Sequence, residues 1–102
     1  MNWDMTEFCV IQMRQSELNM DEVNRFRQYV EAIVDGGKNR IIIDLSGLHN
    51  VSSIGIGSLI MISNKIKKTG GSLKLIGVCD EIARVLKRTK FDMIAPVYIL
   101  LQ

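Results

Sequence analysis

The sequence predicts an α/β fold with a mixed β-sheet, and three observations support this prediction. Apolar runs of strand length alternate along the chain with segments whose apolar residues recur at helical spacing. The run at 40–45, RIIIDL, lacks polar alternation, which is typical of a central strand covered on both faces. Glycine pairs follow two of the helical segments. Strands joined through a helix should pair in parallel with right-handed crossovers.

The first half of the chain supplies two strands and a helix. Residues 7–13, EFCVIQM, alternate in part and predict an N-terminal strand. Asp21 can cap a helix that the glycine pair at 36–37 ends. The apolar positions of this helix follow three- and four-residue spacing: Val23, Phe26, Val30, Ile33 and Val34. The central strand at 40–45 follows, and residues 46–50 form a turn.

The second half repeats the alternation. A helix begins at Ser52 or Ser53, and the glycine pair at 70–71 ends it. Asp80 caps a shorter helix whose apolar positions are Ile82, Val85 and Leu86. The predicted strands of this half are 72–76 and 96–101.

The composition is that of one small globular domain over residues 1–102, with 47% hydrophobic and 24% charged residues. A net charge of +2 is too small to indicate a nucleic-acid partner. Cys9 and Cys79 form no CxxC pair, so we expect reduced core thiols rather than a disulfide framework or a zinc site. Charged residues interrupt the N-terminal stretch, and no run reaches the roughly 18 apolar residues of a membrane span. We therefore expect a cytoplasmic protein without membrane insertion.

Few residues could support catalysis or bind a cofactor. His49 is the only histidine, which leaves no partner for a metal site or a nucleophilic triad, and we expect it in a solvated loop. Asp44 has no second carboxylate near it in sequence. The segment 52–58, SSIGIGS, could cradle a phosphate, but it lacks the lysine of a P-loop. A packing role for Gly55 and Gly57 is favoured, so we expect no enzyme, no cofactor and no metal; weak nucleotide binding stays an alternative.

The segment 44–59, DLSGLHNVSSIGIGSL, lies where the central strand meets the next helix, the edge at which open α/β sheets carry their sites. It resembles the signature of the STAS family (sulfate transporter and anti-sigma factor antagonist), approximately DLSGVTFIDSSGLGVL, without a gap. The order of elements on both sides also resembles that family. The resemblance implies a STAS-like (SpoIIAA-like) fold, with a mixed sheet of four to five strands and three to four helices mainly on one side.

The resemblance also implies a function. Many bacterial members of the family are non-enzymatic anti-sigma factor antagonists that regulate transcription by partner switching. They bind a GHKL-type serine kinase, the anti-sigma factor, and are switched off when it phosphorylates one Ser or Thr. In the gapless alignment that acceptor position is Ile54, which cannot accept a phosphoryl group. Ser52 and Ser53 become the candidate acceptors; if Ser53 caps the helix, the hydroxyl of Ser52 is the more available.

Helical geometry divides the segment after Ser53 into two faces. At about 100° per residue, the core face holds Ile56, Leu59, Ile60, Ile62, Ser63 and Ile66, and the opposite face holds Ile54, Ser58, Met61, Lys65 and Lys68. We expect this second face and the preceding loop to dock a partner. The predicted partner-binding residues are Leu48, His49, Asn50, Ser52, Ser53, Ile54, Ser58, Met61 and Lys65. The residues expected to shape the loop are Asp44, Gly47, Gly55 and Gly57.

Three alternatives stay open. A short N-terminal extension or a second copy of the chain could cover Ile54 and Met61 in place of a regulator. The chain could instead be a STAS subunit of a larger complex, either a component of a lipid ABC transporter or a signalling scaffold. The partner could also be another regulator that binds STAS domains.

Overall fold

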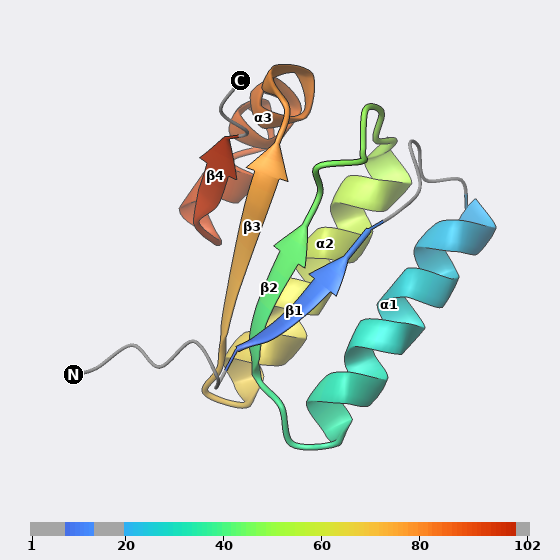
Figure 1. Cartoon of the computed structure of the whole chain (residues 1–102), viewed down its shortest axis with the longest axis vertical. Coiled ribbons are helices and arrows are strands. Elements are labelled where there is room, and N and C mark those ends of the chain that lie inside the picture. The colour runs from blue at the N-terminus through green and yellow to red at the C-terminus, as the bar shows by residue number, and fades with distance from the viewer. Residues whose placement is uncertain (1–7, 14–19, 100–102) are drawn as a thin grey trace.

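The structure is a computed structural model and describes residues 8–13 and 20–99. Strands and helices alternate along these residues (Figure 1). The elements are β1 (Cys9–Gln12), α1 (Met20–Asp35), β2 (Arg40–Asp44), α2 (Ser53–Lys68), β3 (Ser72–Val78), α3 (Asp80–Arg88), the 3-10 turn η2 (Phe91–Met93) and β4 (Val97–Ile99). Spatial order follows chain order, β1-β2-β3-β4, and each neighbouring pair is parallel.

The predicted α/β class and the alternation of strands with helices are confirmed. An antiparallel strand, which a mixed sheet requires, does not occur within residues 8–13 and 20–99. The reason is that each connection between described strands passes through a helix and returns the chain to the same end of the sheet. Residue 7 of the predicted first strand and residues 100–101 of the predicted last strand lie outside the described residues.

The sheet is built around β2, whose three isoleucines are all buried. Ile41 and Ile43 belong to the main core, together with the helix residues Val23, Val30, Val34, Leu59 and Ile62. Ile42 alternates to the opposite face and is also buried. α1 and α2 lie side by side on one face of the sheet, and α3 contacts β4 (Figure 1). Burial on both faces explains why this strand has no polar alternation, with each buried isoleucine contributing about 1.5–3 kcal/mol.

The two predicted helix caps, Asp21 and Asp80, lie inside the first turns of their helices. α1 begins at Met20, so Asp21 lies in its first turn instead of preceding it. Cys79 holds the N-cap position of α3 without a side-chain cap hydrogen bond, and Asp80 is the first helical residue. Acidic side chains are favoured both at the cap and in the first turn, because the amino end of a helix carries partial positive charge. An acidic residue at the start of a helical pattern is therefore compatible with both the cap position and the first turn.

The helix ends agree with the prediction more closely. α1 ends at Asp35, and Gly37 follows with a φ of 102°. α2 ends at Lys68, and Gly70 has a φ of 77°. Glycine adopts these left-handed conformations without steric cost, so both glycine pairs end their helices as expected.

Candidate functional site

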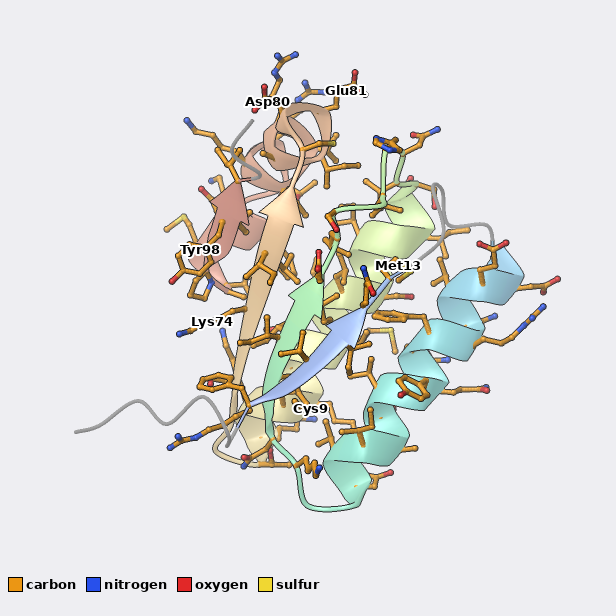
Figure 2. The ribbon with its side chains drawn as sticks, viewed as in Figure 1. Cys9, Met13, Lys74, Asp80, Glu81 and Tyr98 are labelled. Carbon is orange, nitrogen blue, oxygen red and sulfur yellow. The ribbon has the colours of Figure 1, made fainter. Side chains whose placement is uncertain are left out.

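The candidate site lies at the carboxyl edge of the sheet, where β2 leads through residues 45–52 into α2. Figure 2 shows Asp80 and Glu81, at the start of α3, at this same end of the molecule. The side chain of Asp44 accepts a hydrogen bond from the backbone nitrogen of Ser46 at 2.9 Å. The backbone nitrogen of Leu45 donates to the carbonyl of Ile76 at 2.9 Å, which joins the loop to β3. The loop therefore leaves the sheet in a fixed direction.

Gly77 makes this arrangement of Asp44 sterically possible. A Cβ atom at Gly77 would lie 2.8 Å from the Oδ1 of Asp44 and 3.0 Å from the Cβ of Ser46. The φ of Gly77 is 66°, which also favours glycine. Sequence reasoning did not identify Gly77, because the predicted strand ended at residue 76, whereas β3 extends to Val78 and includes this glycine. A glycine inside a strand indicates a close approach of another chain segment.

Leu48 anchors the middle of the loop. Its side chain is fully buried in the core, and its backbone nitrogen donates to the carbonyl of Leu45 at 2.9 Å. The thiol of Cys79 donates to the carbonyl oxygen of Leu48 at 3.6 Å. Cys79 is half-buried and free, as is Cys9. The side chain of Leu48 cannot reach a partner at the surface, whereas the neighbouring His49 and Asn50 are exposed.

Ser52 is the N-cap of α2, which settles the alternative between the two serines. Its backbone is extended, with φ −87° and ψ 169°, and its hydroxyl accepts a hydrogen bond from the backbone nitrogen of Gly55 at 3.2 Å. Its carbonyl accepts from the backbone nitrogen of Ile56 at 3.0 Å. Ser53 is the first helical residue and is exposed. The hydroxyl of Ser53, and not that of Ser52, is therefore the more available of the two.

α2 has the two faces that its spacing predicts. The buried residues are Gly55, Ile56, Leu59, Ile62, Ser63 and Ile66, and Ile60 is half-buried. On the opposite face Ile54 is 47% exposed and Met61 is 56% exposed, two turns apart. We call the residues of this face the outer stripe of α2: Ile54, Gly57, Ser58, Met61, Lys65 and Lys68. The outer stripe exposes two large apolar side chains that nothing in the described part of the chain covers fully.

Among the described residues, an ion-pair network holds Lys65 of the outer stripe. Its Nζ lies 3.3 Å from Oε2 of Glu31 and 3.1 Å from Oδ1 of Asp35, both on α1. The hydrogen bond to Asp35 is the largest cause that raises the pKa of Lys65 above its usual 10.5; desolvation opposes it, and the hydrogen bond to Glu31 and the charges of both carboxylates add to the rise. Arg27 pairs with Glu31 on the same helix. Lys65 therefore joins α2 to α1, and a partner would have to compete with these carboxylates for it.

The glycines of the helix start differ in their surroundings. Gly55 is buried, which fits the expected close packing. A Cβ atom at Gly57 would meet nothing within 4 Å, so the expected packing role within this chain is wrong for Gly57. Gly47 lies half-buried in the turn after β2. Gly57 instead leaves open space on the outer stripe.

The metal and phosphate sites considered from the sequence can be compared with the geometry. No group of three or more His, Cys, Asp and Glu side chains gathers anywhere in residues 8–13 and 20–99. Two of the backbone amides at the start of α2, those of Gly55 and Ile56, already donate to Ser52. Those amides are the donors that a phosphate at a helix start would need. None of the helices in the described residues is long and apolar enough to cross a membrane.

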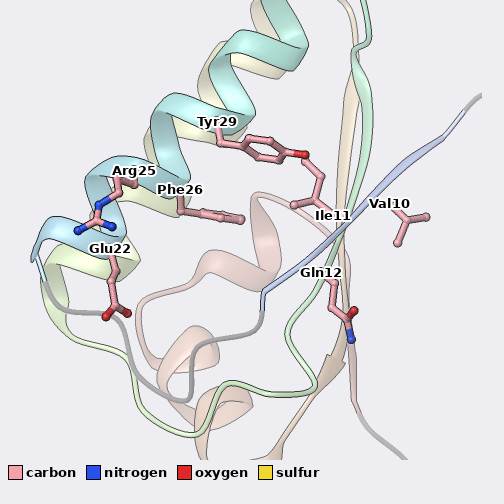
Figure 3. A pocket seen from close by; sticks show the side chains of 7 residues that line it. All are labelled: Val10, Ile11, Gln12, Glu22, Arg25, Phe26 and Tyr29. Carbon is pink, nitrogen blue, oxygen red and sulfur yellow. The ribbon is translucent and has the colours of Figure 1, made fainter.

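A separate hollow of about 690 Å³ lies between β1 and the first half of α1 (Figure 3). Its lining residues are Val10, Ile11, Gln12, Glu22, Arg25, Phe26 and Tyr29. Figure 3 shows Phe26 and Tyr29 pointing from α1 toward β1. None of these residues belongs to the segment 44–59, and residues 14–19, which join the two walls, lie outside the described part. The candidate site is therefore the start and the outer stripe of α2.

Comparisons with known proteins identify the family and the fold. The STAS domain family matches residues 5–99. A Thermotoga neapolitana homolog of TM1081, named as a candidate anti-sigma factor antagonist, is 28% identical over 94% of this chain and 86% of its own length. The crystal structure of TM1081 from Thermotoga maritima, also described as a candidate anti-sigma factor antagonist, is 26% identical, with a TM-score of 0.78 over 87% of this chain and 78% of that one.

The structure of the anti-sigma factor antagonist SpoIIAA in its unphosphorylated form shares the fold. It is 20% identical, with a TM-score of 0.72 over 99% of this chain and 86% of its own. The predicted STAS-like, SpoIIAA-like fold is confirmed by these likenesses.

Proposed function

The chain belongs to the STAS domain family, and on that premise we propose that it is a non-enzymatic regulatory module of the anti-sigma factor antagonist type. Its proposed partner is a GHKL-type serine kinase that acts as the anti-sigma factor, or a related regulator that binds STAS domains. The single observation that carries the proposal is Ile54, a large apolar side chain 47% exposed in the first turn of α2. We propose that the exchange of partners takes place in a bacterial cytoplasm and controls transcription.

The proposed docking surface combines the loop with the outer stripe of α2. Ile54 and Met61 supply the apolar contact, with the smaller Ser58 between them on the same face. The exposed polar residues His49, Asn50 and Ser53 lie toward the loop end of this contact. Apolar anchors with a polar surround are the arrangement in which a few residues contribute most of the binding energy.

We further propose Ser53 as the phosphoacceptor, in place of the usual position that Ile54 occupies. Phosphorylation of Ser53 would add a charge of about −2 next to Ile54, and burying that charge against an apolar partner surface is unfavourable. The same charge is favoured in the undocked chain, because it lies at the amino end of α2. Both effects shift the balance toward release. Phosphorylation of Ser52 would instead have to break the cap hydrogen bond to Gly55.

The docking proposal is tested by calorimetric titration of the purified chain with each GHKL-type kinase encoded in its own genome. Ile54→Asp should weaken docking at least about 100-fold, because it buries an uncompensated carboxylate in the interface. Met93→Asp is the matched control, since Met93 is 81% exposed on η2, away from the outer stripe. Equal affinity of the Ile54→Asp and wild-type chains would place the interface elsewhere.

The acceptor proposal is tested by intact mass of the chain purified from its native cells. A species about 80 Da heavier carries one phosphoryl group, and fragment mapping should locate it on Ser53. Ser53→Ala should lose that species, while Ser52→Ala should retain it. A phosphate that maps to Ser52 would refute the assignment.

A second candidate function is favoured by the absence of a hydroxyl at position 54. A STAS domain without the usual acceptor suits a permanent subunit of a larger complex, such as a lipid ABC transporter or a signalling scaffold. Native purification separates the two functions. A fixed stoichiometry with a transporter ATPase or a scaffold protein under all growth conditions supports the subunit, and exchange between regulators supports partner switching.

A further inference from the structure

The part of the outer stripe from Ile54 to Met61 is symmetric about its middle in side-chain size. Reading along it, a large exposed side chain at Ile54 is followed by Gly57 and Ser58 and then by a large exposed side chain at Met61. Steps of three and four residues place all four on one side of the helix. The order of large and small side chains in this part is the same when it is read backwards. Such a pattern can match a second copy of itself when the two helices run in opposite directions.

Gly57 has no evident use inside this chain. Its backbone is helical, and a Cβ atom would meet nothing within 4 Å. Glycine weakens a helix relative to alanine, so the fold alone would favour a different residue here. A second helix crossing at this point gives the glycine a use, because small residues allow two backbones to approach closely.

The stripe also carries a projection at one end and a hollow at the other. Ile54 projects at the amino end of α2. Toward the carboxyl end there is a hollow of about 490 Å³ lined by Glu31, Met61, Asn64, Lys65 and Lys68. The ammonium group of Lys65 is held by Asp35 and Glu31 on α1. In a two-fold interface, a residue at one end of the surface contacts the other end of the same surface on the second copy. Ile54 of each copy can therefore enter the hollow beside Met61 of the other.

The charges of the helical layer favour the antiparallel arrangement. α1 and α2 both start at the carboxyl edge of the sheet (Figure 1). The first turn of α1 is acidic, with Asp21 and Glu22, while the last turn of α2 is basic, with Lys65, Lys67 and Lys68. With one copy reversed, the exposed Lys68 at the carboxyl end of α2 lies toward the end of the other copy's helical layer where the first turn of α1 carries Asp21 and Glu22. A parallel arrangement would bring the exposed Lys68 of each copy together, which is unfavourable.

We propose that the occupant of the outer stripe is a second copy of this chain. Two α2 helices cross in opposite directions near Gly57 and Ser58, with Ile54 and Met61 in contact across the two-fold axis. The inference concerns the purified chain and does not rest on the proposed function. It has a consequence for that function, because the homodimer covers the same Ile54 that the kinase would bind. Self-association and partner docking then compete.

Sedimentation equilibrium of the purified chain tests the proposal over about 5–500 µM, the range suited to a small interface. The wild-type mass should rise toward twice that of the monomer, and Met61→Glu should weaken dimerisation at least about 10-fold. Met93→Glu, a matched change at an exposed methionine outside the stripe, should leave the dimer unchanged. A monomer over the whole range, or an equal effect of the two changes, would overturn the proposal.

Disulfide cross-linking tests the antiparallel geometry separately, in a chain whose Cys9 and Cys79 are replaced by serine. Ser58→Cys lies near the proposed axis, and oxidation should link two copies, since a disulfide needs Cα atoms within about 7 Å. Lys68→Cys lies two to three turns away on the same face and should not cross-link. Faster linkage through position 68 would refute the crossing. No kinase is present in either experiment, so failure of the docking proposal leaves both results interpretable.

Discussion

The N-cap of α2 provides the most direct test of what stabilises the start of this helix. Ser52→Ala removes the hydroxyl that accepts the hydrogen bond of the Gly55 amide at 3.2 Å. Gly55 is buried, so in the variant its amide cannot fully replace the lost hydrogen bond with one to water. Loss of an N-cap hydroxyl costs about 1 kcal/mol, in a range of about 0.5–2 kcal/mol. For a domain of this size, that loss lowers Tm by about 4–8 °C.

Two matched variants isolate the cap from other effects. Ser52→Gly should cost only about a few tenths of a kcal/mol, because glycine is also accepted at this position. Ser53→Ala should be neutral or slightly stabilising, since Ser53 is exposed and alanine is the better helix former. The assay is urea unfolding followed by far-ultraviolet circular dichroism, with the free energy of unfolding compared among the four chains. A larger loss in Ser53→Ala than in Ser52→Ala would place the cap at Ser53. That result would also reverse the assignment of the available hydroxyl.

Three further predictions concern residues around the site. Ser63→Ala should raise the free energy of unfolding by about 1 kcal/mol, because the buried Ser63 hydroxyl has no hydrogen-bond partner among the described residues; urea unfolding measures it. Gly77→Ala should lower the free energy of unfolding by about 2 kcal/mol, because Gly77 has a positive φ and the new Cβ would lie 2.8 Å from Oδ1 of Asp44. The loss should be smaller when Asp44 is also replaced by alanine. Lys65→Gln should flatten the alkaline pH dependence of Tm. The folded pKa of Lys65 is raised, so its stabilisation is present below the usual 10.5 and is lost as the pH rises through the folded value.

Each of these three has a clear contrary result. A less stable Ser63→Ala chain would mean that the hydroxyl is satisfied. A neutral Gly77→Ala change would mean that Asp44 and Ser46 can move aside at no cost. An unchanged alkaline slope in Lys65→Gln would mean that the pairs with Glu31 and Asp35 do not persist in solution.

The sequence predicted best what depends on local pattern and burial. The run at 40–45 predicts a central strand that is buried on both faces. In the structure the three isoleucines of β2 are buried, and β1 and β3 pair with its two edges. The two faces of α2 follow from helical periodicity alone, so the residue spacing is enough to place Ile54 and Met61 on the exposed side. Both features need only residues that are close in sequence.

Features that need distant residues could not be predicted in the same way. The steric role of Gly77 depends on the register that sets Asp44 beside Ile76. The attachment of Lys65 to α1 joins residues about 30 positions apart and depends on how the two helices lie against each other. The cap was ambiguous for a different reason. Ser52 and Ser53 have the same capping chemistry, so only the backbone conformation at Ser52 distinguishes them.

The isoleucine at the acceptor position proposed from the family resemblance leads to a last prediction, Ile54→Ser. Ile54 is half-exposed, so a serine there should leave the fold intact while it restores a hydroxyl in the first turn of α2. If alignment with the family determines which position the kinase reaches, incubation with the docking kinase and ATP should place phosphate on residue 54. If exposure of a hydroxyl at the helix start decides, phosphate should remain on Ser53 in both chains. Fragment mapping by mass spectrometry distinguishes the two sites. We expect modification at both positions in Ile54→Ser and weaker docking even without ATP, because the apolar anchor is lost. Docking as tight as that of the wild-type chain would contradict the role of Ile54 as the main apolar contact.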